Sequence, residues 1–435
     1  MGGGLLQLVA YGAQDAYITG NPHITFWKVL FKRHTNFAVE AFRVNFTGMP
    51  TYGQRVVAIV NRNADLIWKT YVEVTLPATD ASAAVKWTGG AQRRLGYLML
   101  KQIEVEIGGQ IIDRHYGEWL YLWETLTADF DTSIKLDSMV GGQYNSLDTS
   151  AVSCQGRPDV LYVPLQFWFN RNPGLALPLI ALQYHEVRFN ITLEDSINLV
   201  EGAAATGASL AAAAAALPAL KDMALYIDYV YLDVEERRRF AQASHEYLIE
   251  QLQYSGQQTI TTGSGRIDLT LNHPVKELIW VFQDARYTDC SLPTGLKFTA
   301  PFYYNDIVNR GRIQLNGQDR FDERYGDYFW KVQPYQHHTG GGFNRFIGET
   351  AVIPKTANPI NMYSFAISPE EHQPSGTCNF SRIDTATLVY DSVIANPPVV
   401  GSYPSKAYPY NFRMYAVNYN IFRIMSGMGG LAYSN

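Results

Sequence analysis

Residues 105–117 read VEIGGQIIDRHYG, and residues 313–326 read IQLNGQDRFDERYG. In both stretches apolar side chains alternate with polar ones, which is the period of a β-strand with one solvated face. Gly108-Gly109 then turns the first copy and Asn316-Gly317 turns the second, and such residues tolerate the positive φ angles of a tight hairpin. The numbers of the two turns differ by 208 (317 minus 109), which suggests an internal duplication.

Four further pairs of similar stretches occur in the same order along the chain. Their numbering offsets drift smoothly between 212 and a value near 190. They are FAVEAFRVNFTG at 37–48 with YLIEQLQYSG at 247–256, Leu66-Ile67-Trp68 with Leu278-Ile279-Trp280, residues 163–193 with 362–390, and residues 225–232 with 414–422. Each match is weak alone, but five collinear matches predict a tandem duplication of a domain of about 200 residues.

Each copy consists of short alternating runs rich in Val, Ile, Tyr, Phe and Thr, separated by Gly, Pro and Asn. This pattern predicts an all-β fold of two consecutive antiparallel jelly-roll β-sandwiches, a double jelly roll, with short helices in the loops. One such helix is expected after the first hairpin, where helical spacing relates Trp119, Leu122, Trp123 and Leu126. The corresponding segment near Tyr328 runs into Pro334 and is less clearly helical.

The stretch EERRRFAQAS, residues 235–244, is the predicted linker between the copies. It separates residues 28–234, predicted as the first jelly roll, from residues 245–435, predicted as the second. Residues 201–220 are rich in alanine, which favours a helix, but the Gly and Pro among them favour a loop. We interpret this segment as an exposed loop of the first copy.

Charged residues make up 17% of the 435 residues, below the roughly 25% of an ordinary soluble domain. A surface short of charge is either covered by other subunits or rich in uncharged polar groups, and composition alone leaves both readings open. The net charge of -5 gives no electrostatic reason to bind nucleic acid. The arginine run 237–239 follows Glu235 and Glu236, so it is interpreted as a neutralised, solvated segment.

The three cysteines, Cys154, Cys290 and Cys378, are few, odd in number and far apart, which favours a reducing compartment over a disulfide framework. The N-terminal stretch lacks the pattern of a signal peptide, and Leu6 breaks the myristoylation pattern. Apolar runs are too short to span a bilayer. A soluble chain made inside the cell is expected.

The sequence offers no convincing catalytic motif. His245-Glu246 lacks the second histidine of a zincin helix, His337-His338 has no ligand partner at a useful spacing, and a Gly-Lys phosphate loop is missing. Asp113 and Asp322 recur in both copies, as a hydrolase with paired carboxylates would require, but neighbouring arginines favour ion pairs that fix the hairpins. We therefore predict no catalytic, cofactor-binding or metal site, no cofactor, and no enzymatic activity.

Three N-glycosylation sequons begin at Asn45, Asn190 and Asn379. All lie in strand-like runs of a chain without a secretion signal. Modification by the secretory route is therefore not expected.

Six long stretches carry a family resemblance. They are LVAYGAQDAYITGNPHITFWK at 8–28, NPGLALPLIALQYHEV at 172–187, HEYLIEQLQ at 245–253, IQLNGQDRF at 313–321, QPSGTCNFSRID at 373–384 and NYNIFRIMSGMGGLAY at 418–433. Together they resemble, from end to end, the major capsid protein of large icosahedral nucleocytoplasmic DNA viruses of algae and amoebae.

The resemblance implies a structural protein of the virion. In this family each chain holds two jelly rolls, a homotrimer forms a pseudo-hexameric capsomer, and capsomers tile the icosahedral shell. Six similar sandwiches around a threefold axis would fill a planar lattice. The implied partners are neighbouring capsomers, minor capsid proteins and the inner membrane-associated layer, without direct contact to nucleic acid. Assembly in the host cytoplasm is also implied.

The resemblance also makes residues 1–27 an N-terminal arm that contacts neighbouring chains or minor capsid proteins. Its apolar residues, Leu5, Leu6, Leu8 and Val9, cannot be buried by so short a segment alone. Gly20-Asn21-Pro22 would turn the chain before Phe26 and Trp27 anchor it. Covering the base of its own barrel remains an equal alternative for the arm. The alanine-rich residues 201–220 match the family pattern least.

Two alternatives remain. A carbohydrate-binding module or glycoside hydrolase could be built on duplicated β-sandwiches, with Trp119 and Trp123 stacking on sugars, although their helical spacing favours core packing. A scaffold or minor shell component is closer to the family. The sequence leaves open the virus and host, the triangulation number, the glycosylation state and the minor partners.

Overall fold

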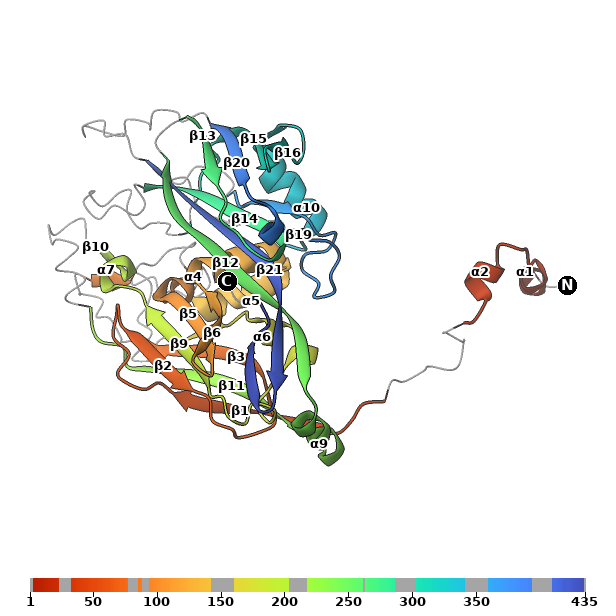
Figure 1. Cartoon of the computed structure of the whole chain (residues 1–435), viewed down its shortest axis with the longest axis horizontal. Coiled ribbons are helices and arrows are strands. Elements are labelled where there is room, and N and C mark those ends of the chain that lie inside the picture. Colours follow the sequence, from red (N-terminus) through yellow and green to blue (C-terminus); the bar gives the residue numbers. More distant parts are fainter. Residues whose placement is uncertain are drawn as a thin grey trace. The chain divides into compact units, whose positions relative to one another are not determined.

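The computed structural model covers the whole chain and describes residues 3–22, 33–76, 85–87, 94–141, 160–202, 217–260, 263–285, 302, 304–340, 359–392 and 409–433 (Figure 1). The chain forms two compact units, residues 1–38 and residues 39–435. The described part of the smaller unit holds two short helices, α1 (Gly3–Val9) and α2 (Ala16–Thr19). Everything else described below lies in the larger unit, apart from the first two residues of β1.

The first sandwich consists of two antiparallel sheets. One has the strand order β1-β11-β3-β7, with β8 also on β3, and the other has the order β2-β9-β5-β6. The bounds are β1 Phe37–Asn45, β2 Arg55–Ile59, β3 Leu66–Thr75, β5 Leu100–Ile107, β6 Gln110–His115, β7 Val160–Pro164, β8 Leu177–Pro178, β9 Val187–Leu193 and β11 Asp222–Leu232. A small separate pair joins β4 (Val85–Trp87) to β10 (Val200–Gly202).

Short helices fill the connections of the first sandwich. They are α3 Leu95–Met99, α4 Gly117–Thr127, α5 Phe130–Val140, α6 Trp168–Arg171, the 3₁₀ turn η1 Pro173–Leu175 and α7 Ser196–Leu199. Helix α4 confirms the helix expected from the spacing of Trp119, Leu122, Trp123 and Leu126. A further helix, α9 (Val234–Gln242), follows β11 and precedes the second sandwich.

The second sandwich repeats the same plan. Its sheets have the orders β12-β21-β14-β18, with β19 on β14 and β22 on β21, and β13-β20-β15-β16, with β17 on β15. The bounds are β12 His245–Ile260, β13 Ser264–Asp268, β14 Pro274–Asp284, β15 Val308–Leu315, β16 Gln318–Asp319, β17 Arg324–Tyr325, β18 Asn361–Ser364, β19 Cys378–Asn379, β20 Ala386–Ser392, β21 Tyr410–Met425 and β22 Met428–Leu431. Its helical turns are η3 Tyr328–Val332, α10 Gln333–His337 and η4 Phe380–Arg382.

The strand orders of the two sandwiches match strand for strand, which confirms the predicted double jelly roll. Strands β1, β11, β3 and β7 correspond to β12, β21, β14 and β18, and strands β2, β9, β5 and β6 correspond to β13, β20, β15 and β16. The small strands β8 and β19 take equivalent places beside β3 and β14. Two sandwiches of one topology in a single chain are what a tandem duplication produces.

Irregularities in the ladders repeat with the same numbering offset. A register shift follows Leu100 in β5 and Val308 in β15, and 308 minus 100 is again 208. A second shift follows Ile67 in β3 and Val275 in β14, which gives the same difference (275 minus 67). Bulges bend a strand at a defined place, so their agreement shows that the two copies share backbone detail as well as topology.

The repeated hairpins adopt the expected turns. Gly108 and Gly109 have φ angles of 59° and 84°, and Asn316 and Gly317 have φ angles of 50° and 78°. All four residues therefore lie in the left-handed region, which Gly and Asn enter most readily. The turn chemistry of both copies is confirmed.

The predicted match of residues 66–68 with residues 278–280 pairs the correct strands, β3 and β14, but the wrong residues within them. Leu66 and Ile67 pair with β8, whereas the residues that pair with the equivalent β19 are Pro274 and Val275. The numbering offset is thus 208 at this point, and the predicted alignment of Leu66 with Leu278 is wrong by four residues. An even error leaves the apolar alternation intact, so the pattern could not reveal it.

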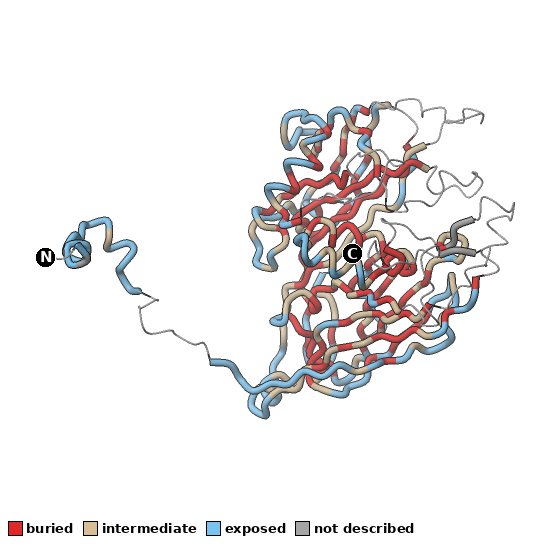
Figure 2. The backbone as a smooth tube through the Cα atoms, turned by 180° about the vertical axis from the view of Figure 1, so that it is seen from behind, coloured by how far each residue is buried: buried red, intermediate tan, exposed pale blue. Residues whose placement is uncertain are grey.

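Two strands of the second sandwich are buried on both faces. In β14, Leu278 and Trp280 enter the core of the second sandwich, while Ile279 joins a core that is continuous with the first sandwich. In β21, Met414 likewise enters the core of the second sandwich, and Tyr415 joins the core that is continuous with the first sandwich. Neighbouring side chains of a strand point to opposite faces, so this sheet is covered on its inner face by its own partner sheet and on its outer face by the first sandwich. Figure 2 shows buried residues running through both sandwiches.

The alanine-rich segment and the domain boundaries were also predicted from the sequence. The alanine-rich loop lies mostly outside the described residues, since residues 203–216 are not among them. The boundaries 28–234, 235–244 and 245–435 stay predictions. Within the described ranges, no helix has the length and apolar character needed to cross a membrane.

Candidate functional site

The contact between the two sandwiches, called the seam from here on, brings charged and aromatic side chains of both together. It joins α4 and α6 of the first sandwich to the outer face of the β12-β21-β14 sheet. At its centre Arg413 forms a bidentate ion pair with Glu118. The Arg413 Nε–Glu118 Oε2 distance is 2.7 Å, and the Arg413 Nη2–Glu118 Oε1 distance is 2.6 Å. Tyr415 and Tyr304 donate hydrogen bonds to the same carboxylate at 2.6 and 3.0 Å.

The central ion pair is largely withdrawn from solvent. The side chains of Arg413 and Glu118 are 10% and 14% exposed. Burial opposes the charge of the guanidinium, but the contact with Glu118 outweighs it and raises the pKa of Arg413. Removing one partner of such a pair would leave a buried charge without its counter-ion, which typically destabilises a protein by several kcal/mol. The seam is therefore built to hold the sandwiches in one arrangement.

Aromatic side chains surround this ion pair. The ring of Trp119 lies 5.7 Å from that of Tyr415, and Tyr116 lies 4.9 Å from Tyr254. Trp119 and Trp123 are only 2% and 5% exposed. They cannot serve as sugar-stacking platforms, so the carbohydrate-binding alternative is not supported.

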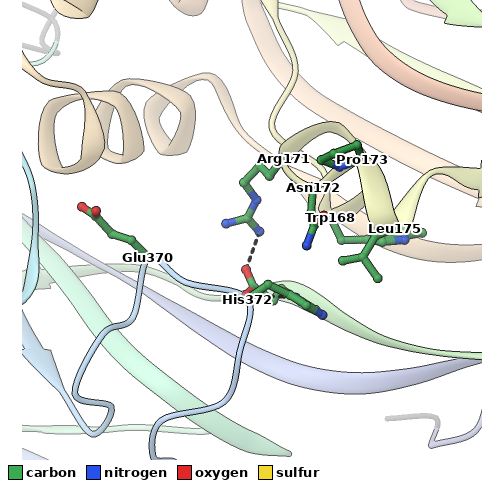
Figure 3. A pocket seen from close by; sticks show the side chains of 8 residues that line it. Trp168, Arg171, Asn172, Pro173, Leu175, Glu370 and His372 are labelled. Atoms are coloured by element: carbon green, nitrogen blue, oxygen red, sulfur yellow. Dashed lines mark ion pairs between the residues drawn. The ribbon is translucent and has the colours of Figure 1, made fainter. Parts of the chain in front are cut away.

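A pocket opens beside the seam (Figure 3). Its volume is about 200 Å³, and its lining residues are Trp168, Arg171, Asn172, Pro173, Leu175, Glu250, Glu370 and His372. Figure 3 shows Arg171 extending from α6 toward the second sandwich, where its Nη2 lies 2.8 Å from Glu250 Oε2. Lys276 Nζ lies 2.7 Å from the other oxygen of Glu250. Burial opposes ionisation of Glu250, but Arg171, His372 and Lys276 together lower its pKa to about 2.

A second buried charge cluster centres on His338. Its Nε2 lies 2.9 Å from Glu277 Oε2, and its Nδ1 lies 2.9 Å from Glu370 Oε1. Burial opposes protonation, but the two carboxylates outweigh it and raise the pKa of His338 to about 9. The ring also meets the edge of Trp123, with centroids 6.4 Å apart. The sequence interpretation missed these partners because Glu277 and Glu370 are far from the histidine along the chain.

The other sequence candidates are structural. His245 Nε2 lies 2.8 Å from the carbonyl oxygen of Phe240, and His337 Nδ1 lies 3.0 Å from that of Ile367. Over the described ranges, no group of three or more His, Cys, Asp or Glu side chains is placed to hold a metal ion. Cys378 is a free, partly buried thiol, and the other two cysteines lie outside the described residues.

Asp113 and Asp322 differ in role. Asp113 is buried in the seam, where its Oδ1 accepts the N–H of Leu252 at 3.0 Å and its Oδ2 lies 3.0 Å from His115 Nε2. The predicted arginine partner is therefore wrong for this copy. Asp322 is exposed, and the described ion pairs of its hairpin instead join Arg312 to Asp319 and Arg310 to Glu323.

The three sequons have different surroundings. Asn45 and Asn379 are exposed, whereas Asn190 is 3% exposed and its amide donates to Glu106 Oε2 at 2.8 Å. Asn379 Oδ1 accepts the N–H of Ser381 at 3.1 Å. The side chain of Asn190 is therefore buried and hydrogen-bonded inside the fold.

The N-terminal unit presents apolar side chains at its surface. Leu5, Leu6, Leu8 and Val9 of α1 are between 58% and 79% exposed. Asn21 has a φ of 52° within the predicted turn at residues 20–22. The anchoring residues Phe26 and Trp27 lie outside the described part of the chain.

Comparisons with known proteins agree along the whole chain. Residues 25–233 match the family model described as major capsid protein N-terminus, and residues 236–430 match large eukaryotic DNA virus major capsid protein. The chain is 46% identical to the major capsid protein of Pyramimonas orientalis virus and 42% identical to that of Paramecium bursaria Chlorella virus 1, with all of each chain covered.

Solved structures give the same result. The chain resembles the subunit in a quasi-atomic model of the PBCV-1 virus capsid, with a TM-score of 0.75, 36% identity, and 94% and 100% of the two chains covered. It also resembles the Faustovirus major capsid protein, with a TM-score of 0.71, 12% identity, and 95% and 94% coverage. The second likeness, at this low identity, concerns the fold alone.

Proposed function

This chain belongs to the family of major capsid proteins of large eukaryotic DNA viruses, and on that premise we propose that it assembles into homotrimeric capsomers that tile an icosahedral shell. Its function is structural, since its relatives are capsid proteins along their whole length. Each capsomer would present six sandwiches around a threefold axis and so have a nearly hexagonal outline.

One observation carries the proposal. The two sandwiches share strand order and the positions of their register shifts, yet they differ in side chains. Three copies of a chain with two such sandwiches supply six similar blocks, and a repeated head-to-tail contact forms a closed ring when the rotation between neighbouring copies closes. The duplication thereby lets a trimer occupy a hexagonal cell.

The surface supports assembly. The chain carries 17% charged residues, and permanent subunit interfaces are depleted of charge and bury more than about 2,000 Å². Tyr335 and Ile367 are 85% and 75% exposed, and they lie on segments that the contact between His337 Nδ1 and the carbonyl oxygen of Ile367 joins. Exposed apolar side chains on neighbouring segments favour a contact with further subunits.

The apolar N-terminal unit supports a role in contacts beyond the trimer. We assign residues 1–27 to an arm that binds neighbouring capsomers, minor capsid proteins or the inner membrane-associated layer. The four large apolar side chains of α1 are exposed in this structure, and a partner surface would remove them from water.

The domain boundaries, the absence of catalysis and the place of assembly are proposed on the same family membership. The domain boundaries are 28–234 and 245–435, joined by a linker at 235–244. The protein acts without catalysis, cofactor, metal or direct contact with nucleic acid, in a virion assembled in the host cytoplasm. The buried charge clusters of the seam are then stabilising elements.

The trimer is tested by native mass spectrometry of the purified chain. The expected mass is three times that of the 48.9 kDa chain. A monomer at micromolar concentration would contradict the proposal.

The arm is tested by deleting residues 1–25. The expected product is a folded trimer that assembles poorly into larger arrays. A variant with serine at Leu5, Leu6, Leu8 and Val9 should share this defect, and a matched control, Gln7→Ser, should not. Normal array formation by the deletion variant would refute the arm's role.

A further inference from the structure

The pocket beside the seam is bounded by both sandwiches. On one side, α6 supplies Trp168 and Arg171, and η1 supplies Pro173. On the other side, Glu250 comes from β12 and His372 from the segment between β18 and β19. The volume of about 200 Å³ has room for several water molecules or one small organic molecule. A molecule held there would contact both halves of the chain at once.

The carboxylates of this pocket already have protein partners. Glu250 is 4% exposed, with Oε2 at 2.8 Å from Arg171 Nη2 and Oε1 at 2.7 Å from Lys276 Nζ. Glu370 Oε1 accepts the N–H of Thr339 at 2.8 Å, and Oε2 accepts the hydroxyl of the same residue at 2.5 Å. Figure 3 shows the Glu370 carboxylate directed away from Arg171. The acidic groups are therefore engaged within the protein, and the pocket is not arranged to bind a cation.

The guanidinium of Arg171 still has donors to offer. Such a group has five N–H donors on a planar fork, and among the described residues its ion pair with Glu250 uses Nη2 alone. The guanidinium also lies over the ring of Trp123, 4.7 Å from the centroid. This cation–π contact and the ion pair together fix its orientation. One edge of the fork is thus held ready for a second acceptor, and the two oxygens of a carboxylate fit such an edge.

Asn172 supplies a second donor from the next position in the chain. Its Oδ1 accepts the N–H of Gly174 at 2.8 Å and so caps η1. This contact fixes which end of the amide is the oxygen, and Figure 3 shows the nitrogen end pointing into the pocket beside Arg171. Within the described ranges, Nδ2 of Asn172 has no acceptor. Two successive residues therefore direct unused N–H groups into one space.

The remaining wall of the pocket is apolar. Trp168 and Leu175 are 2% and 9% exposed, and Pro173 lies beside them in the lining. Ligand sites commonly combine such a wall with a few placed polar groups. A guanidinium edge and an amide next to an apolar wall suit an acid with a short hydrocarbon body better than an inorganic anion.

We propose that this pocket binds a small organic acid, with Arg171 and Asn172 donating to its carboxylate and Trp168, Pro173 and Leu175 surrounding its apolar body. The site is independent of the proposed trimer, since every residue that forms it belongs to one chain. A ligand that binds only the folded chain stabilises it by mass action. Here the ligand would add a link between α6 of the first sandwich and β12 of the second.

The binding test uses the purified full chain with acetate, propionate and butyrate at constant ionic strength. Isothermal titration calorimetry should show affinity rising from acetate to butyrate, because each added methylene group leaves water for the apolar wall. Butanol, which lacks the charge, should bind at least about tenfold more weakly, because it cannot accept charge-assisted hydrogen bonds of the same strength. Butyrate should also raise the Tm progressively with its concentration.

Asn172→Asp is the sharpest variant. It keeps the oxygen that caps η1 and places a negative charge where the carboxylate of the ligand would lie, so butyrate binding should be lost. The matched control is Asn379→Asp, because Asn379 caps η4 in the same way, through the N–H of Ser381 at 3.1 Å, and is exposed outside the pocket. This control should bind butyrate as the unsubstituted chain does.

Arg171→Lys separates the fork from the charge. Lysine keeps a cation beside Glu250 but cannot present two parallel N–H groups, so butyrate should bind about tenfold more weakly. This variant also decides the matter if Asn172→Asp does not fold.

Three results would overturn the proposed site. The first is that butyrate does not bind the unsubstituted chain at about 10 mM, a concentration at which even a millimolar Kd would be detected. The second is that Asn172→Asp, or Arg171→Lys in its place, binds butyrate as tightly as the unsubstituted chain. The third is that inorganic phosphate binds more tightly than butyrate, which would make the pocket a general anion site. None of these results bears on the trimer.

Discussion

The ion pair between Glu118 and Arg413 offers the sharpest test of the seam. Glu118→Gln preserves the shape of the side chain and removes its charge. Arg413 would stay largely buried and would retain hydrogen bonds to Gln283 at 2.8 Å and Gln257 at 3.2 Å. Loss of one partner of a buried pair typically destabilises by about 3 to 5 kcal/mol. Because two hydrogen bonds remain, we expect a loss of about 3 kcal/mol in the free energy of unfolding.

Urea denaturation followed by tryptophan fluorescence measures this loss, since Trp119 packs directly on the seam. The matched control is Glu246→Gln, which removes an ion pair with Arg423 whose side chains are 58% and 47% exposed. An exposed pair contributes about 0 to 1 kcal/mol. The double substitution of Glu118 and Arg413 by glutamine should be less harmful than the sum of the single ones. A loss for Glu118→Gln no larger than that of the control would refute the claim that the seam depends on this pair.

Three further predictions concern the seam and the duplicated hairpin. The stabilisation from charged His338 should be complete below its ordinary pKa of 6.5 and should fade as pH rises toward the folded value of about 9. In pH-dependent denaturation, Glu277→Gln should reduce this slope without abolishing it, because Glu370 Oε1 still lies 2.9 Å from His338 Nδ1. Gly326→Ala should destabilise by more than about 2 kcal/mol, because its Cβ would overlap a backbone oxygen, whereas Gly109→Ala, with open space around it, should show only the smaller strain of its positive φ in thermal unfolding. Trp123→Ala, at 5% exposure, should lower the free energy of unfolding by about 3 to 5 kcal/mol in urea, and a loss under about 1 kcal/mol would show that the seam does not bury this ring.

Much of the fold follows from local patterns in the sequence. The alternation before Gly109 and Gly317 predicts strands, the residue types predict the turns, and the spacing of Trp119 and Trp123 predicts α4. These signals are local because each strand or turn depends on neighbours in the chain. A four-residue error in aligning the first sandwich with the second survived because it preserves that alternation.

The seam could not be predicted in the same way. Glu118 and Arg413 are 295 residues apart, and neither stands in a pattern that points to the other. Glu277 and Glu370 likewise reach His338 only through the packing of separate strands. One signal was available, since residues 278–282 of β14 read LIWVF and form an unbroken apolar run, as expected for a strand covered on both sides. Such a pattern indicates a second layer without saying which segment supplies it.

The central claim is that two sibling sandwiches in one chain let a threefold assembly imitate sixfold packing. Electron micrographs of the isolated oligomer, analysed for rotational symmetry along its axis, test this claim most directly. The account predicts true threefold symmetry with a strong additional sixfold component in the outline. A twofold particle, or a threefold particle without that sixfold component, would contradict it.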